Sequence, residues 1–282
     1  MTSLPAATRE SVEALGEGGH VVAILTRPAP RDGAADPLPL VLLNAGVIHR
    51  VGPHRLHVRL ARTLAAAGRA ALRIDLSGIG DSRPLAQGRG FRDSAVADVA
   101  AALDHLQARL GTRRALLFGI CSGADNALAA ALHDPRVAGI VLVDPHAYAT
   151  RRARLRRLWQ RARARLADGR VFARRQRNAA PPPGAQGGEG SARHAPPRAQ
   201  MRRELNALVA RDVRILSIHT CAQGVRNNHA GQVFEAFPEL RGKLDARYFP
   251  RANHTFTALA EQAALIDAVA AWCDTHFPAG RA

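Results

Sequence analysis

The sequence has 282 residues and a formal net charge of +17, which is long enough for one large α/β domain with a sizeable core. It contains no apolar run near the roughly 18 residues of a membrane span, and its first residues lack the pattern of a signal peptide. The three cysteines, Cys121, Cys221 and Cys273, are widely spaced, which argues against a disulfide framework. We therefore expect a cytoplasmic protein.

The positive charge is concentrated in one segment. Residues 151–203 contain 16 arginines against Asp168 and Glu189, so this segment carries +14 and the rest of the chain only +3. A nucleic-acid surface would interleave basic residues with aromatic ones, and here Trp159 and Phe172 are the aromatic residues of the segment. We therefore expect nucleic acid not to be a partner.

Short apolar runs alternate with longer helical patterns along the chain. The expected strands are 20–26, 38–44, 70–76, 115–120, 137–143, 213–219 and 244–249, and the expected helices are 54–67, 94–110, 122–133 and 259–276. Nearly continuous apolar strands between helices are typical of a mostly parallel sheet covered on both faces. The sequence thus predicts an α/β core made of residues 1–146 and 209–282.

Residues 147–208 interrupt this pattern. Their first half is rich in arginine and has apolar residues at helical spacing, namely Leu155, Leu158, Trp159, Ala162 and Leu166. Residues from about 179 to 200 are rich in proline and glycine and have too few apolar side chains to fold alone. We interpret the insert as a basic amphipathic helix followed by a flexible loop.

The stretch from Gly119 to Gly123 reads Gly-Ile-Cys-Ser-Gly between an apolar strand and an alanine-rich helix. This is the context of a nucleophile elbow, where two glycines flank the nucleophile because larger side chains would collide in the sharp turn. The spacing makes Cys121 the central residue, since a central Ser122 would place the bulky Ile120 where a small residue is needed. The backbone N–H of Ser122 would then form half of an oxyanion hole.

Four blocks of sequence carry a resemblance to a known family. They are LLNAGVIHRVGPHRLHVRLARTLAAAG (42–68), LRIDLSGIGDS (72–82), GICSGAD (119–125) and ANHTFT (252–257). Together they resemble α/β-hydrolases of the serine-aminopeptidase and monoglyceride-lipase branch, and they are most similar to hydrolases associated with the exosortase A system in bacterial exopolysaccharide loci. The resemblance implies an α/β-hydrolase fold with a lid insert, a hydrolase activity and a link to exopolysaccharide production.

The resemblance also suggests where the partners of Cys121 lie. The second oxyanion donor should follow the strand that ends near Asn44, as the backbone N–H of Gly46 or Val47. The base should be a histidine in the loop after the last strand, and His254 stands there.

The acid departs from the family pattern, because no carboxylate closely follows the strand 213–219. Asp144, at the end of the preceding strand, is one alternative. Asn227, Asn228 or the more distant Glu235 could orient the imidazole instead, which a cysteine nucleophile tolerates better than a serine. The third alternative is that the triad has lost its acid.

These residues predict acyl transfer through a cysteine thioester, acting on esters, thioesters or lactones, as a hydrolase or an acyltransferase. The alternative is a catalytically impaired hydrolase-fold protein that binds a ligand. We expect neither a cofactor nor a metal, because dinucleotide and phosphate-loop motifs and metal-ligand spacings are missing. The basic helix within residues 151–178 could also contact an anionic membrane.

Overall fold

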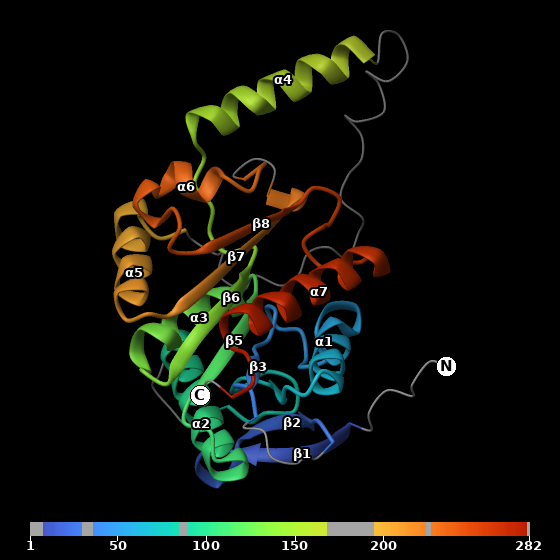
Figure 1. Ribbon diagram of the computed structural model, residues 1–282, viewed down its shortest axis with the longest axis vertical. Coiled ribbons are helices and arrows are strands. Elements are labelled where there is room, and N and C mark those ends of the chain that lie inside the picture. Colours follow the sequence, from blue (N-terminus) through green and yellow to red (C-terminus); the bar gives the residue numbers. More distant parts are fainter. Residues whose placement is uncertain (1–7, 30–35, 85–89, 168–194, 224–226, 281–282) are drawn as a thin grey trace.

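The computed structural model describes residues 8–29, 36–84, 90–167, 195–223 and 227–280. In these residues the strands form one sheet in the order β1-β2-β4-β3-β5-β6-β7-β8 (Figure 1). The strands are β1 (Arg9–Leu15), β2 (Val21–Arg27), β3 (Leu40–Leu42), β4 (Ala71–Ile74), β5 (Ala115–Ile120), β6 (Val137–Val143), β7 (Arg214–Thr220) and β8 (Asp245–Phe249). β2 pairs antiparallel with β1 and with β4, and the remaining neighbours are parallel. The predicted mostly parallel sheet is confirmed.

Helices cover both faces of the sheet. α1 (Leu56–Ala66) and α7 (Leu259–His276) lie on one face, and α2 (Phe91–Leu110), α3 (Ser122–His133) and α5 (Arg198–Ala210) lie on the other (Figure 1). Two clusters of buried apolar side chains fill the spaces between the sheet and these two helical layers. The middle strands β5 and β6 are buried at every position, which explains why their sequences read as continuous apolar runs.

The insert differs from its prediction in one respect. Its first half forms the expected helix, α4 (Arg151–Ala167), but the flexible loop predicted up to residue 200 is wrong at its end, because α5 begins at Arg198. Met201, Leu205 and Leu208 recur at helical spacing and are buried against the core, which makes α5 part of the α/β layer. The rest of the predicted loop, 179–194, lies outside the described residues.

The residues of the candidate site lie at one edge of the sheet, where the parallel strands end. The carboxyl ends of β5, β6, β7 and β8 all lie at this edge, and the chain leaves it at Cys121, at Asp144, after Thr220 and in the loop that contains His254. Loops at the carboxyl ends of parallel strands are where α/β proteins build their sites. Among the described helices, none is long and apolar enough to cross a membrane.

Candidate active site

Cys121 occupies the sharp turn between β5 and α3. Its backbone is strained, with φ of 59° and ψ of −120°. A Cβ atom on Gly119 would lie 2.0 Å from the carbonyl oxygen of Gly123, and one on Gly123 would lie 2.4 Å from that of Asn44. Both positions therefore require glycine. The turn has the geometry of a nucleophile elbow, with Cys121 at its centre.

Asp144 and His254 meet next to this elbow. Asp144 directly follows β6, is fully buried, and adopts a left-handed backbone with φ of 49°. Its Oδ2 accepts a hydrogen bond of 2.7 Å from Nδ1 of His254. Thr220, the last residue of β7, donates to the same carboxylate from its backbone N–H at 2.8 Å and from its hydroxyl at 2.7 Å. The carboxylate is thus fixed by its position at the end of β6 and by the hydrogen bonds from Thr220 of β7.

The electrostatics of the pair favour the charged form of both groups. Burial acts to raise the pKa of Asp144, but the hydrogen bonds from His254 and Thr220 outweigh it and hold that pKa below its usual value. The hydrogen bond to Asp144, followed by the one to Cys121, raises the pKa of His254 to about 10. His254 therefore bridges the carboxylate and the thiol, and both contacts favour its imidazolium form. An imidazolium beside a thiol favours the thiolate, which is the reactive form.

The other predicted orienting residues are engaged elsewhere. Asn228 donates from Nδ2 to the carbonyl oxygen of Ala153 at 2.8 Å, and Glu235 accepts from the hydroxyl of Thr150. Asn227 is buried and lines a small cavity beside His219. The structure thus brings Asp144, and not these three residues, into hydrogen-bonding contact with His254.

The predicted oxyanion loop lies against the elbow. The backbone N–H of Gly46 donates to the hydroxyl oxygen of Ser122 at 2.9 Å, while Val47 is 87% exposed. Ser122 is the first residue of α3, so its own backbone N–H has no partner inside the helix and is free to bind an oxyanion. The hydroxyl of Ser122 therefore links the loop of Gly46 to the elbow, and the N–H of Gly46 is bonded to this hydroxyl in the structure.

Sequence reasoning missed three supports of this site. Asn44 is buried, and its side chain donates to Ile48 and Asp75 and accepts from the N–H of Leu76, which fixes the shape of the oxyanion loop. The bond from Thr220 to Asp144 and that from Gly46 to Ser122 were also missed. A polar residue directly after the predicted strand 213–219 was the available signal for Thr220.

A cluster of His49, Asp75 and Asp81 near this loop has donor atoms close enough to hold a cation. Arg50, however, pairs with both carboxylates, through a short contact to Asp75 and at 2.8 Å to Asp81. A guanidinium that neutralises both carboxylates leaves little attraction for a metal ion. We assign the cluster a structural role in the loop that contains Asp75.

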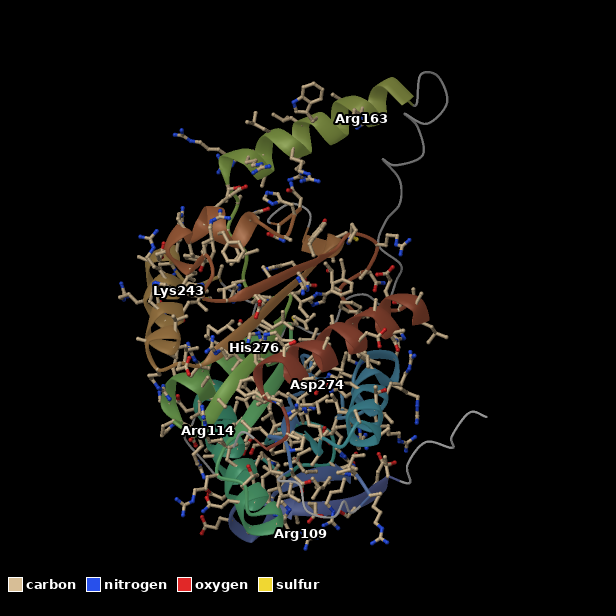
Figure 2. The ribbon with its side chains drawn as sticks, viewed as in Figure 1. Arg109, Arg114, Arg163, Lys243, Asp274 and His276 are labelled. Atoms are coloured by element: carbon tan, nitrogen blue, oxygen red, sulfur yellow. The ribbon has the colours of Figure 1, made fainter. Side chains whose placement is uncertain are left out.

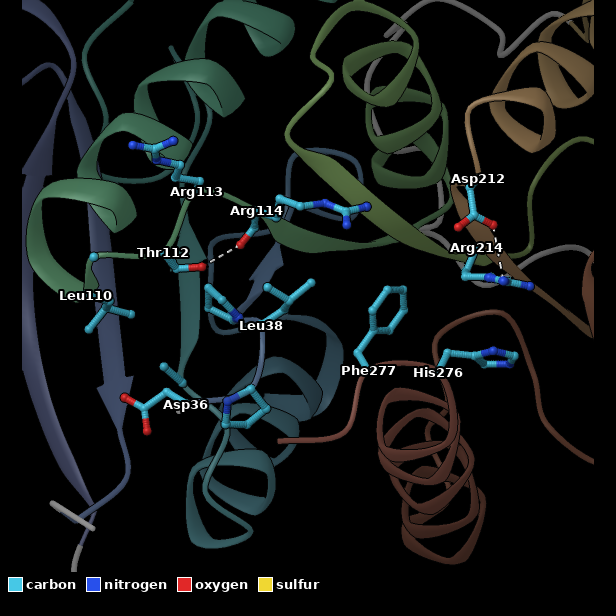
Figure 3. Close-up of a pocket in the computed structure, with 14 residues that line it drawn as sticks. Asp36, Leu38, Leu110, Thr112, Arg113, Arg114, Asp212, Arg214, His276 and Phe277 are labelled. Carbon is cyan, nitrogen blue, oxygen red and sulfur yellow. Dashed lines mark hydrogen bonds and ion pairs between the residues drawn. The ribbon is translucent and has the colours of Figure 1, made fainter. Parts of the chain in front are cut away.

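A larger cavity of about 680 Å³ lies at the opposite edge of the sheet (Figure 3). Its wall includes Leu38, Leu110, Arg114, Arg214 and Phe277. Residues 38 and 114 lie just before β3 and β5, and residue 214 begins β7. The three residues of the elbow site follow the ends of their strands. The cavity is therefore separate from Cys121.

Comparisons with known proteins agree with this fold. The fold and elbow are those of an α/β hydrolase, and the sequence model of the serine aminopeptidase S33 family matches residues 40–228. The chain therefore belongs to the serine aminopeptidase S33 family. A search among curated proteins found no match.

Several solved structures share the fold at low sequence identity. A dienelactone hydrolase from Anabaena variabilis is 17% identical, with 96% of this chain and 98% of that chain covered and a TM-score of 0.57. An α/β serine hydrolase without a lid from Xanthomonas campestris is 15% identical, with 98% and 97% covered and a TM-score of 0.56. An acetyl xylan esterase from Paenibacillus is 18% identical, with 97% and 90% covered and a TM-score of 0.53. At these identities the likeness concerns the fold alone.

Proposed function

We propose that this α/β hydrolase cleaves esters or thioesters, or transfers their acyl groups, with Cys121 as nucleophile, His254 as base and acid, and Asp144 as the residue that orients His254. The observation that carries the proposal is the position of the His254 ring, which hydrogen-bonds to Asp144 on one side and to Cys121 on the other. A nucleophile, a base within reach and a third group behind the base define the triad arrangement.

The proposed reaction has two halves. The Cys121 thiolate attacks the carbonyl carbon, and the oxyanion that forms is held by the N–H groups of Ser122 and of Gly46 or Val47. The carbonyl re-forms as the bond to the leaving alcohol or thiol breaks, and that group takes the proton of the His254 imidazolium. His254 then removes a proton from water or another acceptor, which attacks the thioester and releases the acid or the new ester together with the Cys121 thiolate.

The nucleophile favours some substrates over others. A thiolate is itself a good leaving group, so its adduct with an amide collapses back unless the amine is protonated as it departs. Esters, thioesters and lactones leave more readily, and we propose these as the substrate class although the family takes its name from peptidases. The names of the dienelactone hydrolase and esterase structures agree with this class.

The argument for a catalytically impaired binding protein is that no carboxylate closely follows residues 213–219. The hydrogen bond between Asp144 and His254 speaks against that argument, because Asp144 can take the place of the missing acid. For the biological role we propose a link to exopolysaccharide production, which the four resembling sequence blocks support.

The test is hydrolysis of p-nitrophenyl esters and short acyl thioesters by the purified protein and by a Cys121→Ala variant. Cys221→Ala is the matched control, because Cys221 is an exposed cysteine outside the elbow. We expect the first variant to lose more than 99% of the activity and the control to retain it. Full activity in Cys121→Ala would refute the proposal, as would a complete loss in Ser122→Ala combined with activity in Cys121→Ala.

A further inference from the structure

Helix α4 lies beyond the short helix α6 (Gln232–Ala236) and strand β8, apart from the two helical layers (Figure 1). Its first turn is attached to the core: the carbonyl oxygen of Ala153 accepts from Asn228, and Arg152 lies 3.7 Å from the carboxylate of Glu235. The helix carries eight arginines in 17 residues and no acidic residue. Figure 2 shows one of them, Arg163, on the outlying part of the helix.

The apolar side of α4 faces away from the protein. Leu155 and Leu158 are each 59% exposed and Trp159 is 70% exposed, whereas Ala153 is 4% exposed. At about 100° per residue, Ala153 lies roughly 160° around the helix from Leu155, so the side that touches the core is opposite to the leucines and the tryptophan. Isolated exposed apolar residues are ordinary, but a leucine and tryptophan stripe on a helix marks an interaction surface.

The arginines border this stripe on both sides. With Leu155 at the centre of the stripe, Arg152 and Arg163 fall on one flank, and Arg154 falls on the other. Leucine and tryptophan between flanking arginines is the composition of helices that lie in the interface of an anionic bilayer, where long cationic side chains reach the lipid phosphates.

The charge also disfavours other occupants of the stripe. Residues 168–194 of this chain carry five arginines against Asp168 and Glu189, so they have the same sign of charge as α4 and would be repelled from it. A second copy of α4 would be repelled for the same reason. A nucleic acid would attract the arginines but would leave the leucine and tryptophan stripe in water.

We propose that α4 docks on an anionic membrane surface, with Leu155, Leu158 and Trp159 inserted at the level of the headgroups. The helix begins seven residues after Asp144, at the same edge of the sheet as Cys121. Docking therefore brings the active-site edge close to the bilayer. The use of lipid-borne esters as substrates would follow from this placement, and it rests on the proposed function. The docking itself does not depend on the proposed function.

The experiment is sedimentation of the full chain with vesicles of phosphatidylcholine alone or mixed with phosphatidylglycerol. We expect binding to the mixed vesicles only, and at least a tenfold weaker binding for the triple variant Leu155→Ser, Leu158→Ser and Trp159→Ser. Phe91→Ser is the matched control, since Phe91 is a 51% exposed aromatic residue at the start of α2. Unchanged hydrolysis of a water-soluble ester by the triple variant shows that it is folded.

Fluorescence separates insertion from simple attraction of charges. Trp272 is buried and donates to Asp245, so Trp159 is the tryptophan that responds to a bilayer. A blue shift with mixed vesicles that disappears in Trp159→Phe supports the proposal. Equal vesicle binding by the triple variant and the full chain, binding without any blue shift, or binding to a single-stranded RNA in preference to vesicles would each overturn it. Hydrolysis of soluble esters without vesicle binding would overturn the docking and leave the proposed function standing.

Discussion

The carboxylate of Asp144 and the imidazole of His254 are joined by a 2.7 Å hydrogen bond although 110 residues separate them in the chain. The bond exists because β6 and β8 both end at the same edge of the sheet, on either side of β7. The family pattern places its acid after the strand that corresponds to β7. Here Thr220, the last residue of β7, instead donates to Asp144, which follows the neighbouring strand β6. In the proposed triad the acid therefore follows β6 and not β7, while the histidine lies in the loop after β8.

Replacing Asp144 should lower the pKa of His254. The bond to Asp144 is the largest cause that raises this pKa to about 10, so the imidazolium is held at lower pH and is lost as the pH rises through about 10. In Asp144→Asn we expect the pKa to fall toward the ordinary value of about 6.5, which leaves the ring neutral at pH 8. Nitrogen NMR of ¹⁵N-histidine-labelled protein reports this change directly.

The matched control is Glu235→Gln, which removes a partly buried carboxylate whose partners are Thr150, Arg152 and His229. We expect His254 to remain doubly protonated at pH 8 in this variant. A titration of His254 that responds to Glu235→Gln but not to Asp144→Asn would show that the acid has been assigned to the wrong residue.

Removing the hydroxyl of Ser122 should slow acyl transfer but not the alkylation of Cys121. The hydroxyl holds the N–H of Gly46 beside the elbow, and we expect Ser122→Ala to lower kcat for esters about tenfold with little change in KM. Alkylation of Cys121 by iodoacetamide forms no oxyanion, so its rate should stay within about twofold of the wild type. Ser122→Thr, which keeps a hydroxyl, should recover part of kcat.

Two outcomes would contradict this role for Ser122. A rise in kcat in Ser122→Ala would mean that the hydroxyl blocks the N–H of Gly46 instead of positioning it. An equal loss of esterase and alkylation rates would mean that the substitution has disturbed the elbow as a whole.

A methyl group at Gly119 should destabilise the fold. Its Cβ would lie 2.0 Å from a backbone oxygen, so the turn between β5 and α3 would have to move, and we expect Gly119→Ala to lower the free energy of unfolding by about 3 kcal/mol or more. Gly90→Ala is the control, because its Cβ would meet its nearest atom at 3.9 Å and its φ is −60°. Urea denaturation followed by circular dichroism measures both, and similar small losses would disprove the steric account of the elbow.

His57 should make the fold sensitive to acid. It is fully buried against the ring of Phe118, and burial lowers its pKa to about 3. The unfolded chain binds a proton near pH 6.5 that the folded protein does not bind, so stability is present above this pH and is lost as the pH falls toward 3. Between pH 7 and pH 5 we expect His57 to account for a loss of about 2 kcal/mol.

The check is urea denaturation of the wild type and of His57→Gln at both pH values. The variant should lose less stability on acidification than the wild type does, by about 2 kcal/mol. The same dependence on pH in both proteins would show that His57 does not carry this effect.

The parts of the fold that sequence predicted well are those with both faces buried. Strands 115–120 and 137–143 and helix 122–133 agree with the structure to the residue, because an apolar run followed by a glycine-flanked turn has one interpretation. β1 was missed, since RESVEAL contains good helix formers and as an edge strand it buries only part of one face. α5 was missed because its polar face and the preceding prolines resemble the loop before it.

The sequence predicted those residues of the candidate site that a local sequence pattern identifies. Glycine spacing selected Cys121, and the position after the last strand selected His254. The choice of Asp144 over Asn227, Asn228 and Glu235 depends on how β6, β7 and β8 align across the sheet, which no local pattern contains. The contacts of Asn44 and the hydroxyl of Ser122 are likewise long-range, and only the folded chain reveals them.

The most direct test of the central claim is the site of the acyl group in a trapped intermediate. The protein is mixed with p-nitrophenyl acetate, quenched in acid within seconds, and digested, and the peptide that contains Cys121 and Ser122 is fragmented in a mass spectrometer. The account predicts one acetyl group on the sulfur of Cys121, removable by neutral hydroxylamine. An acetyl group on the oxygen of Ser122, or rapid hydrolysis by a protein whose Cys121 never carries the label, would contradict it.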